Sequence, residues 1–142
     1  MAEIRNLHVG DHDALRRLCE AVVVDFRPSP SGPGAFLEDP ASFVLGAYVG
    51  EEPVGLAWGL QMRSPSGRLT TYLHELEVRE PWRRLGIATA LVTAAFDRAR
   101  RDGSIRFWLS TGGHNQVAQA VYEALGGERK PAGDVNYWWR LD

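Results

Sequence analysis

The 142-residue chain is predicted to be an α+β protein with a central mixed, mostly antiparallel sheet flanked by helices. Two observations predict this fold class. Three stretches of strand-forming residues follow one another between residues 42 and 78 with only short turns between them, which is typical of antiparallel neighbours. The apolar residues then change to a helical period before another short apolar run, which predicts a strand–helix–strand unit with two parallel strands and a right-handed crossover.

The composition is typical of one globular domain. A chain of 142 residues can bury one hydrophobic core, and no repeat or linker divides it, so residues 1–142 are interpreted as a single domain. The hydrophobic fraction is 44%, yet no apolar run approaches the roughly 20 residues that a membrane span needs. The first residues lack the apolar segment of a secretory signal, which predicts a cytoplasmic protein with no membrane partner.

Charge and cysteine content exclude further classes of protein. The formal net charge is -2, whereas nucleic-acid binders are usually basic, so no nucleic-acid partner is expected. Cys19 is the only cysteine, which excludes internal disulfides and a multi-cysteine zinc site, and no metal is expected. Because Cys19 falls on an apolar helical face, we interpret it as a packed core residue rather than a nucleophile.

The first third of the chain is predicted to contain a strand, a helix and a loop. Residues 3–8 can form the strand, and Asp11 is placed as the N-cap of the helix, with Asp13 in its first turn. Three prolines in residues 27–34 prevent the helix from continuing, so this segment is predicted to be a loop. One apolar stripe with a 3.6-residue period defines the helix: Leu15, Leu18, Cys19, Val22 and Phe26.

The middle of the chain is predicted to form three strands in sequence. Residues 42–49 and 54–61 have strand composition and are joined by a turn at residues 50–53. A second turn, at residues 63–68, precedes a longer strand over residues 69–78. The short turns predict that each strand pairs antiparallel with the next.

The last third of the chain is predicted to alternate between helices and strands. A strongly amphipathic helix covers residues 84–102 and is ended by Gly103, and residues 105–110 are apolar enough for a buried strand. A second amphipathic helix covers residues 116–125 and is also followed by a glycine. Residues 135–141 are predicted to form the final strand.

The loop before the long helix has the features of an anion-binding turn. Arg83, Arg84 and Gly86 lie where a strand gives way to a helix, and the first amides of a helix have no intrahelical acceptors and lie at the positive end of its dipole. Such a turn can hold a pyrophosphate, with Gly86 and Ala88 allowing close approach and the arginines adding charge-assisted bonds. Tight helix–sheet packing beside a solvated turn explains the same residues equally well.

This loop resembles the acetyl-coenzyme A signature of the GCN5-related N-acetyltransferase (GNAT) superfamily. That signature is Gln or Arg, two residues, Gly, one residue, and then Gly or Ala. The chain has Arg83-x-x-Gly86-x-Ala88, preceded by Leu76-x-Val78 at the end of a strand.

A second motif is similar to the family's segment before its last strands. It is Asn115-x-x-Ala118-x-x-x-Tyr122-x-x-Leu125-Gly126, and it follows the first motif in the expected order. The order of elements also agrees, so the resemblance covers nearly the whole chain. It implies a GNAT fold, whose twisted sheet has six to seven strands and is splayed between the fourth and fifth.

The resemblance also implies residue roles around acetyl-coenzyme A. The backbone of Leu76 to Val78 should pair with the pantetheine arm like an added strand, and one amide there would polarise the thioester carbonyl. Arg83 and Asn115 are also expected to bind the cofactor, although Asn115 is equally interpreted as a helix N-cap. Tyr122 would protonate the departing thiolate, the alternative being a half-buried core tyrosine. The pyrophosphate should be held by the amides of Arg84, Gly86, Ile87, Ala88 and Thr89.

A base must remove a proton from the acceptor amine, since an alkylammonium with a pKa of roughly 10 has no lone pair. Glu75 is the first candidate and Glu77 the second, acting directly or through water. Strand alternation is expected to place both glutamates on one face of the strand and His74 on the other. The alternative interpretation is that all three are solvent-facing strand positions.

The acceptor amine is suggested by a finer resemblance. Glu75 followed by Leu-x-Val and the run Arg-Arg-Leu-Gly-Ile-Ala-Thr-Ala-Leu at residues 83–91 look most like the aminoglycoside 3-N-acetyltransferase branch. That likeness implies a small polycationic amine held by several carboxylates. Further candidates for contacting it are Asp25, Glu38, His74 and Asp134.

Other interpretations of the sequence stay open. The chain can be a GNAT acetyltransferase of another small amine, an amino acid or a protein N-terminus. It can also be a non-catalytic acyl-coenzyme-A-binding sensor. A homodimer is expected, because the family often dimerises and residues 137–140 carry more aromatic surface than one face can bury.

Overall fold

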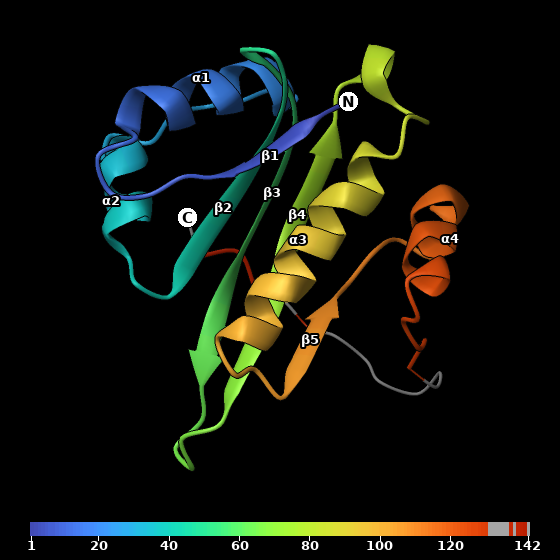
Figure 1. The fold of residues 1–142 in the computed structure, drawn as a ribbon. Helices are drawn as coiled ribbons and strands as arrows, with labels where there is room; N and C mark the ends of the chain where they lie inside the picture. The colour runs from blue at the N-terminus through green and yellow to red at the C-terminus, as the bar shows by residue number, and fades with distance from the viewer. Residues whose placement is uncertain (131–136, 138, 142) are drawn as a thin grey trace.

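The computed structural model describes residues 1–130, 137 and 139–141, and it confirms the predicted α+β class (Figure 1). The elements, in chain order, are β1 Glu3–Asn6, α1 His12–Val22, α2 Gly32–Glu38, β2 Ser42–Val49, β3 Glu52–Arg63, β4 Leu69–Val78, the 3-10 helix η1 Glu80–Trp82, α3 Ile87–Arg101, β5 Arg106–Leu109 and α4 Gln116–Ala124.

The described strands form one sheet in the order β1-β2-β3-β4-β5. Each of the strands β1 to β4 pairs antiparallel with the next, and β5 pairs parallel with β4, which confirms both predicted pairings. The described sheet has five strands rather than six to seven. Most of the strand predicted at 135–141 lies outside the described residues, and residues 137 and 139–141 belong to no strand.

A β-bulge interrupts the pairing of β3 with β4. Trp58 is opposite Glu75, but the next residue, Gly59, is opposite Leu73, so His74 is an extra residue on β4. The backbones are very close at this point, because a Cβ on Gly59 would lie 2.0 Å from the carbonyl oxygen of Tyr72. The missing side chain of Gly59 therefore allows the bulge to form.

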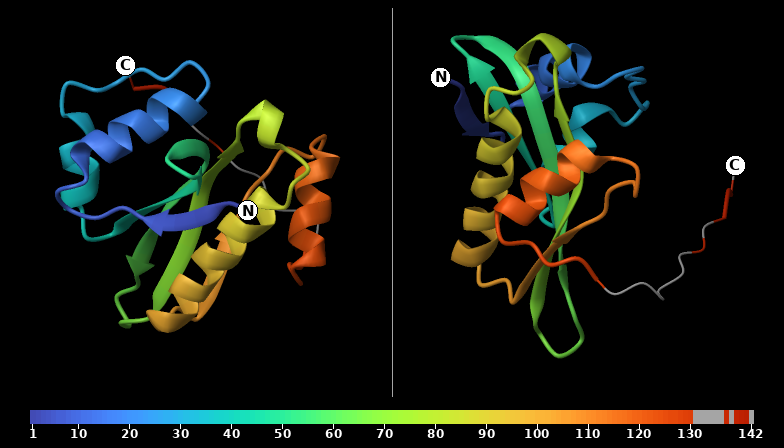
Figure 2. Two further views of the ribbon diagram at one scale, coloured as in Figure 1. Left: turned by 45° about the horizontal axis from the view of Figure 1, so that its top comes forward. Right: turned by 90° about the vertical axis from the view of Figure 1, so that its right-hand side faces the viewer.

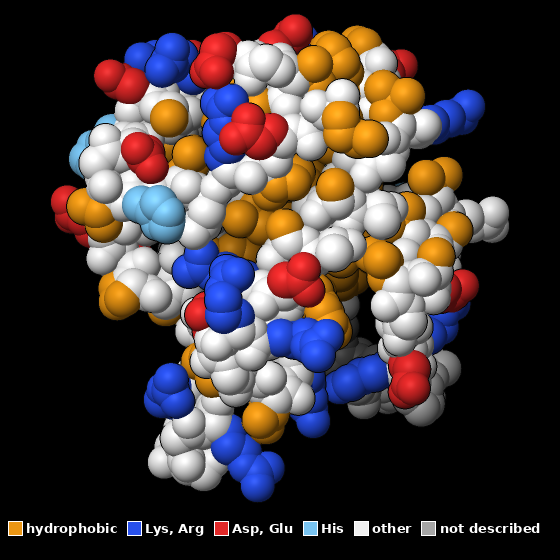
Figure 3. Space-filling model, in the orientation of Figure 1, with side chains coloured by type: hydrophobic (Ala, Val, Ile, Leu, Met, Phe, Trp, Pro, Cys, Tyr) orange, Lys and Arg blue, Asp and Glu red, His pale blue; other side chains and the backbone are white. Residues whose placement is uncertain are grey.

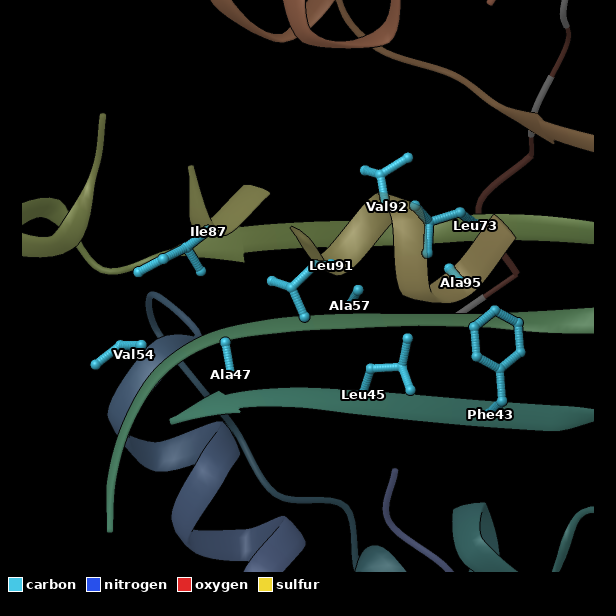
Figure 4. Close-up of a cluster of buried hydrophobic side chains, with 10 residues drawn as sticks. All are labelled: Phe43, Leu45, Ala47, Val54, Ala57, Leu73, Ile87, Leu91, Val92 and Ala95. Atoms are coloured by element: carbon cyan, nitrogen blue, oxygen red, sulfur yellow. The ribbon is translucent and has the colours of Figure 1, made fainter. Parts of the chain in front are cut away.

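Two layers of helices cover the two faces of the sheet (Figure 2). The helix α3 packs on one face and α1 and α2 pack on the other, so each face has its own core. On the face of α1 and α2 the buried side chains are Leu15, Leu18, Val22, Leu37, Val44, Tyr48 and Leu56. On the face of α3 (Figure 4) they are Phe43, Leu45, Ala47, Val54, Ala57, Leu73, Ile87, Leu91, Val92 and Ala95.

The N-terminal region differs from its prediction in three respects. α1 ends at Val22, so Phe26 lies in the following segment instead of extending the helical stripe. Asp11 precedes the helix as predicted, but its Oδ2 accepts a hydrogen bond from the backbone N–H of His8 at 2.8 Å and caps no helix amide. Part of the predicted loop forms α2, where Pro33 occupies a first-turn position that needs no N–H donor.

The α3 helix begins after the loop that contains Arg83, Arg84 and Gly86 and ends at Arg101, and Gly103, two residues later, has the left-handed φ of 85° expected just after a helix. Its last turn contains Arg98, Arg100 and Arg101, which complement the negative end of the helix dipole. In the space-filling view, basic side chains gather on the lower part of the face that carries α3, near the end of that helix (Figure 3). Every helix in the described part of the chain is too short or too polar to cross a lipid bilayer.

Candidate active site

The turn before α3 leaves a set of backbone amides without helical acceptors. The first helical hydrogen bond runs from the N–H of Ala90 to the carbonyl of Gly86 at 3.0 Å, so the amides of residues 86–89 have no acceptor within the helix. Gly86 has a left-handed φ of 80°, and a Cβ on it would meet nothing within 4 Å. Backbone conformation, rather than lack of space, therefore favours glycine at this position.

The two arginines of the loop, Arg83 and Arg84, differ in their hydrogen bonds and backbone conformation. The Nε of Arg83 donates a hydrogen bond to the carbonyl of Val78 at 2.9 Å, which ties the loop to the end of β4. Arg84 has an unusual left-handed φ of 64°. Both side chains are exposed beside the start of α3. The loop thus combines positive charge with the free amides.

The strands β4 and β5 separate next to this turn, as the family resemblance implied. Their pairing runs only from Thr70 opposite Arg106 to Leu73 opposite Leu109. Beyond this point β4 stays paired with β3 as far as Val78, and no described strand covers its other edge. The resulting split faces the N-terminus of α3, and α4 lies beyond β5 (Figure 1).

The α4 helix carries both residues of the second motif. Asn115 is its N-cap, with Oδ1 accepting a hydrogen bond from the backbone N–H of Ala118 at 3.1 Å. Tyr122 is half-buried and packs against the core under α3. Burial raises the pKa of Tyr122 above its ordinary value, and its hydroxyl makes no hydrogen bond to any described residue. The phenol is therefore a protonated donor at neutral pH.

Both predicted bases face the α1 and α2 side of the sheet. Trp58 Nε1 donates a hydrogen bond to Glu75 Oε2 at 2.6 Å and fixes that carboxylate. Burial raises the pKa of Glu77, and the negative charge of Glu75 adds to this effect, while the backbone N–H of Val24 and the charge of Arg83 act in the opposite direction. Glu77 Oε2 is buried without a hydrogen-bond partner among the described residues.

The predicted position of His74 is wrong. Its ring lies 4.6 Å from the ring of Trp58, measured between centroids, and Trp58 also binds Glu75. His74 therefore lies on the same side as the glutamates and not on the opposite face. The reason is the bulge, which adds a residue and breaks the alternation of side chains along β4.

The other predicted acceptor contacts that the structure describes, Asp25 and Glu38, are exposed. Asp25 is exposed and has a left-handed φ of 55°, although its neighbour Val24 reaches Glu77 through its backbone. Glu38 is exposed at the end of α2. Asp134 lies outside the described residues.

A cavity of about 280 Å³ lies between α1, α2 and β3, on the same side of the sheet as the glutamates. Trp58 and Phe36 line it, and their rings make an edge-to-face contact at 5.7 Å between centroids. The sequence analysis did not identify either residue. The alternation of β3 could have placed Trp58 on a face, but no pattern indicated that α2 would form and supply Phe36.

No metal centre is found among the residues that the structure describes, because no group of three or more His, Cys, Asp and Glu side chains could hold an ion. The groups that could hold a ligand are the amides before α3 and the uncovered edge of β4. Carboxylates and an aromatic-lined cavity lie on the opposite side of that strand. This arrangement can bring an anionic cofactor and a cationic acceptor together across β4.

Solved structures of other proteins share this architecture. An aminoglycoside acetyltransferase from an uncultured soil metagenomic sample, solved with sisomicin, is 16% identical, with a TM-score of 0.87 over 99% of this chain and 97% of that one. The aminoglycoside N-acetyltransferase AAC(6')-Iy, solved with CoA, is 18% identical, with a TM-score of 0.75 over 100% of this chain and 96% of that one.

The name of a third protein of similar structure indicates a different acceptor. The ribosomal-protein-alanine N-acetyltransferase from Brucella melitensis biovar Abortus 2308 is 22% identical, with a TM-score of 0.72 over 97% of this chain and 100% of that one. At these identities the likeness establishes the fold and leaves the acceptor open. No curated protein matches the sequence.

Family membership follows from the sequence comparison. The model of the acetyltransferase (GNAT) family matches residues 3–127, which include both motifs, the split between β4 and β5 and all of α3. The chain therefore belongs to the GNAT family of acetyltransferases.

Proposed function

We propose that this acetyltransferase moves the acetyl group of acetyl-CoA to a primary amine by direct attack in a ternary complex. The observation that carries the proposal is the position of two carboxylates, Glu75 and Glu77, on the strand whose free edge faces the amides before α3. Direct transfer needs an anion site, a base and an acceptor site close together, and β4 carries both candidate bases and leads into the loop before α3.

The cofactor side fits a pyrophosphate followed by an extended arm. The amides of residues 86–89 and the exposed Arg84 would bind the diphosphate at the positive end of the α3 dipole. The backbone from Leu76 to Val78 would pair with the pantetheine arm as an added strand. One amide of this edge would donate to the thioester oxygen, where negative charge develops during attack. Arg83 positions the loop through its bond to Val78.

Glu75 is the proposed base and Glu77 the second carboxylate. The bond from Trp58 orients Glu75, so that its other oxygen can accept a proton from the acceptor's ammonium group, directly or through water, and the resulting free amine attacks the thioester. Partial burial raises the pKa of Glu77 above its ordinary value, which suits a group that exchanges protons during turnover. The positive charge of the acceptor is attracted to the same pair of carboxylates.

Tyr122 is the proposed acid. A thiolate leaves more readily when a donor protonates it, and the raised pKa keeps the Tyr122 phenol protonated for this step. Asn115 supports Tyr122 by fixing the first turn of α4. These roles are absent from a non-catalytic acyl-CoA sensor, which would bind the cofactor without releasing free thiol.

Two classes of acceptor are candidates. An aminoglycoside amine, at the 3-N position by the finer sequence resemblance, is supported by the structural likeness to aminoglycoside acetyltransferases. A small amine with an apolar body is supported by the aromatic lining of the cavity beside Glu75. Aminoglycosides bring several positive charges to this site, and the second class brings one.

The test is release of CoA thiol from acetyl-CoA in the presence of an amine panel. We expect saturable binding of acetyl-CoA by calorimetry, thiol release that depends on an amine, and an acetylated product by mass spectrometry. Binding without thiol release for every amine would favour the sensor. No binding at millimolar acetyl-CoA would contradict the proposal altogether.

The homodimer and the cytoplasmic location stay predictions. Light scattering after size-exclusion chromatography measures the first, with a mass near twice 15.8 kDa as the expected result. Fractionation of the producing cells measures the second.

A further inference from the structure

We infer that the cavity between α1, α2 and β3 binds the apolar body of the acceptor, so that the substrate is a primary monoamine carrying an aromatic or branched aliphatic group. This inference rests on the proposed acetyl transfer and selects between its two candidate acceptor classes. It is argued from the lining of the cavity, its connection to Glu75 and the charges around it.

The lining of the cavity is mainly apolar and comes from the α1 and α2 layer and from the strands β2 and β3 beneath it. Its volume of about 280 Å³ is close to the lower end of the usual range for small-molecule sites, roughly 300–1,000 Å³, which suits one ring or a branched chain. The apolar side chains that line it include Leu15, Phe26, Phe36, Val44, Leu56 and Trp58. An apolar group placed among them would leave water, which favours binding.

The cavity is linked to the proposed base through two of its lining residues, Trp58 and Cys19. Trp58 lines it and donates the 2.6 Å hydrogen bond to Glu75. Cys19 also lines it, and the charge of Glu75 contributes to raising the pKa of the Cys19 thiol. An amine held at Glu75 would therefore have its carbon skeleton at the mouth of the cavity.

The charges around the cavity favour a single positive charge on the ligand. Among the described residues that line it, none is a carboxylate and two are arginines, Arg16 and Arg27. Arg16 pairs with its own helix neighbours, Asp13 at 3.6 Å and Glu20 at 3.3 Å, and no described residue forms an ion pair with Arg27. Further ammonium groups of a polycation would face apolar walls and these arginines, which is unfavourable.

The kinetic test compares amines that differ in their body and share a primary amine. With acetyl-CoA saturating, we expect kcat/KM for 2-phenylethylamine and isoamylamine to exceed that for ethanolamine by about 10-fold or more, as burial of an apolar group predicts. Sisomicin is the polycationic comparison. Higher kcat/KM for sisomicin or ethanolamine than for both apolar amines would overturn the inference.

A pair of variants tests the site itself. Phe36→Ala should raise KM for 2-phenylethylamine by about 5-fold or more, with little change for ethanolamine and none in acetyl-CoA affinity. The matched control is Phe96→Ala, because Phe96 is a 42% exposed residue of α3 on the opposite face. Equal loss for both amines in Phe36→Ala would overturn the inference, since it would indicate a general structural effect.

Labelling of Cys19 gives a readout that is independent of turnover. Burial raises the pKa of this thiol to about 11, so maleimide reacts slowly enough at pH 8.5 for protection to be timed by mass spectrometry. Saturating 2-phenylethylamine should slow labelling about 5-fold, whereas ethanolamine should leave it unchanged. Sisomicin turnover with no protection of Cys19 by apolar amines would overturn the inference and leave the acetyl transfer in place. Absence of turnover with every amine would overturn both.

Discussion

The indole of Trp58 donates a 2.6 Å hydrogen bond to the carboxylate of Glu75 across the β3–β4 pair. Trp58 therefore both lines the cavity proposed for the acceptor and orients the proposed base. A bond to a charged acceptor of this kind contributes about 1.5–3 kcal/mol. Replacing the indole by a ring without N–H should loosen the carboxylate. We expect Trp58→Phe to lower kcat/KM for the preferred amine by about 10-fold. The control is Trp108→Phe on β5, measured by the same thiol assay, and a similar loss there would contradict the role of Trp58.

The proposed base gives a second prediction. Glu75→Gln keeps the shape of the side chain and removes its capacity to take a proton, so kcat should fall by about 100-fold or more. The affinity for acetyl-CoA, measured by calorimetry, should stay within about 2-fold because Glu75 faces the other side of β4. An unchanged kcat would assign the proton transfer to another group.

Glu77 makes folding stability depend on pH. Its pKa is raised above the unfolded value of 4.5, so between the two pKa values the folded chain binds more protons than the unfolded chain. The contribution of Glu77 to stability is therefore fully present below pH 4.5 and is lost as pH rises through the folded pKa. Glu77→Gln removes this loss, so its melting temperature relative to wild type should rise from pH 4 to pH 7. A difference that is constant with pH, or that falls, would refute the prediction; Glu128→Gln, at an exposed position, is the control.

Tyr122 and Tyr48 form a matched pair, because burial raises the pKa of both. Tyr122→Phe should cut turnover by about 10- to 100-fold with nearly intact acetyl-CoA affinity, as expected for a general acid. Tyr48→Phe, in the core under α1, should leave turnover close to wild type. Equal rates for the two variants would remove Tyr122 from the mechanism.

Gly86 and Gly103 flank α3 and have nearly the same left-handed φ, 80° and 85°, with open space around both. Substitution by alanine should cost each variant roughly 1–2 kcal/mol of unfolding free energy. Only Gly86→Ala should also weaken acetyl-CoA binding, by about 10-fold or more, because it reorients the amides before the helix. Calorimetry and urea unfolding separate the two effects, and equal acetyl-CoA affinities would contradict the anion site.

The bulge in β4 depends on Gly59. A Cβ at this position would collide with the backbone of Tyr72, so Gly59→Ala should destabilise the fold by more than about 2 kcal/mol. The control is Gly113→Ala, where a Cβ meets nothing within 4 Å. Thermal unfolding of both variants measures the difference.

Sequence patterns predicted the elements whose signals are local. The bounds of β2 and β4 were predicted correctly, because alternation and flanking turns define them. Asn115 was placed as a cap, and the split between β4 and β5 followed from the family resemblance. These features depend on residues that are close in sequence or on a recognisable motif.

Features that depend on distant contacts were not predicted. α2 is a short helix with glycines and a proline, and Leu37 and Phe36 hold it against the sheet. The bulge at His74 arises where Gly59 of another strand allows close approach, so alternation alone gave the wrong face for that histidine. The cavity likewise needs Trp58 and α2 to meet in space.

Because His74 is an extra residue in β4, the face on which Leu73 lies no longer determines the face on which Glu75 lies. In a strand with regular alternation, Leu73 and Glu75 would share a face. With Glu75 on the α1 side, Leu73 would then also lie on that side and could not pack in the core under α3. With the bulge, Leu73 and Leu76 both pack under α3 while Glu75 and Glu77 face the other way. Substitutions at the two acidic positions can therefore change the proposed acceptor side without disturbing the packing under α3 and the proposed diphosphate turn that precedes that helix.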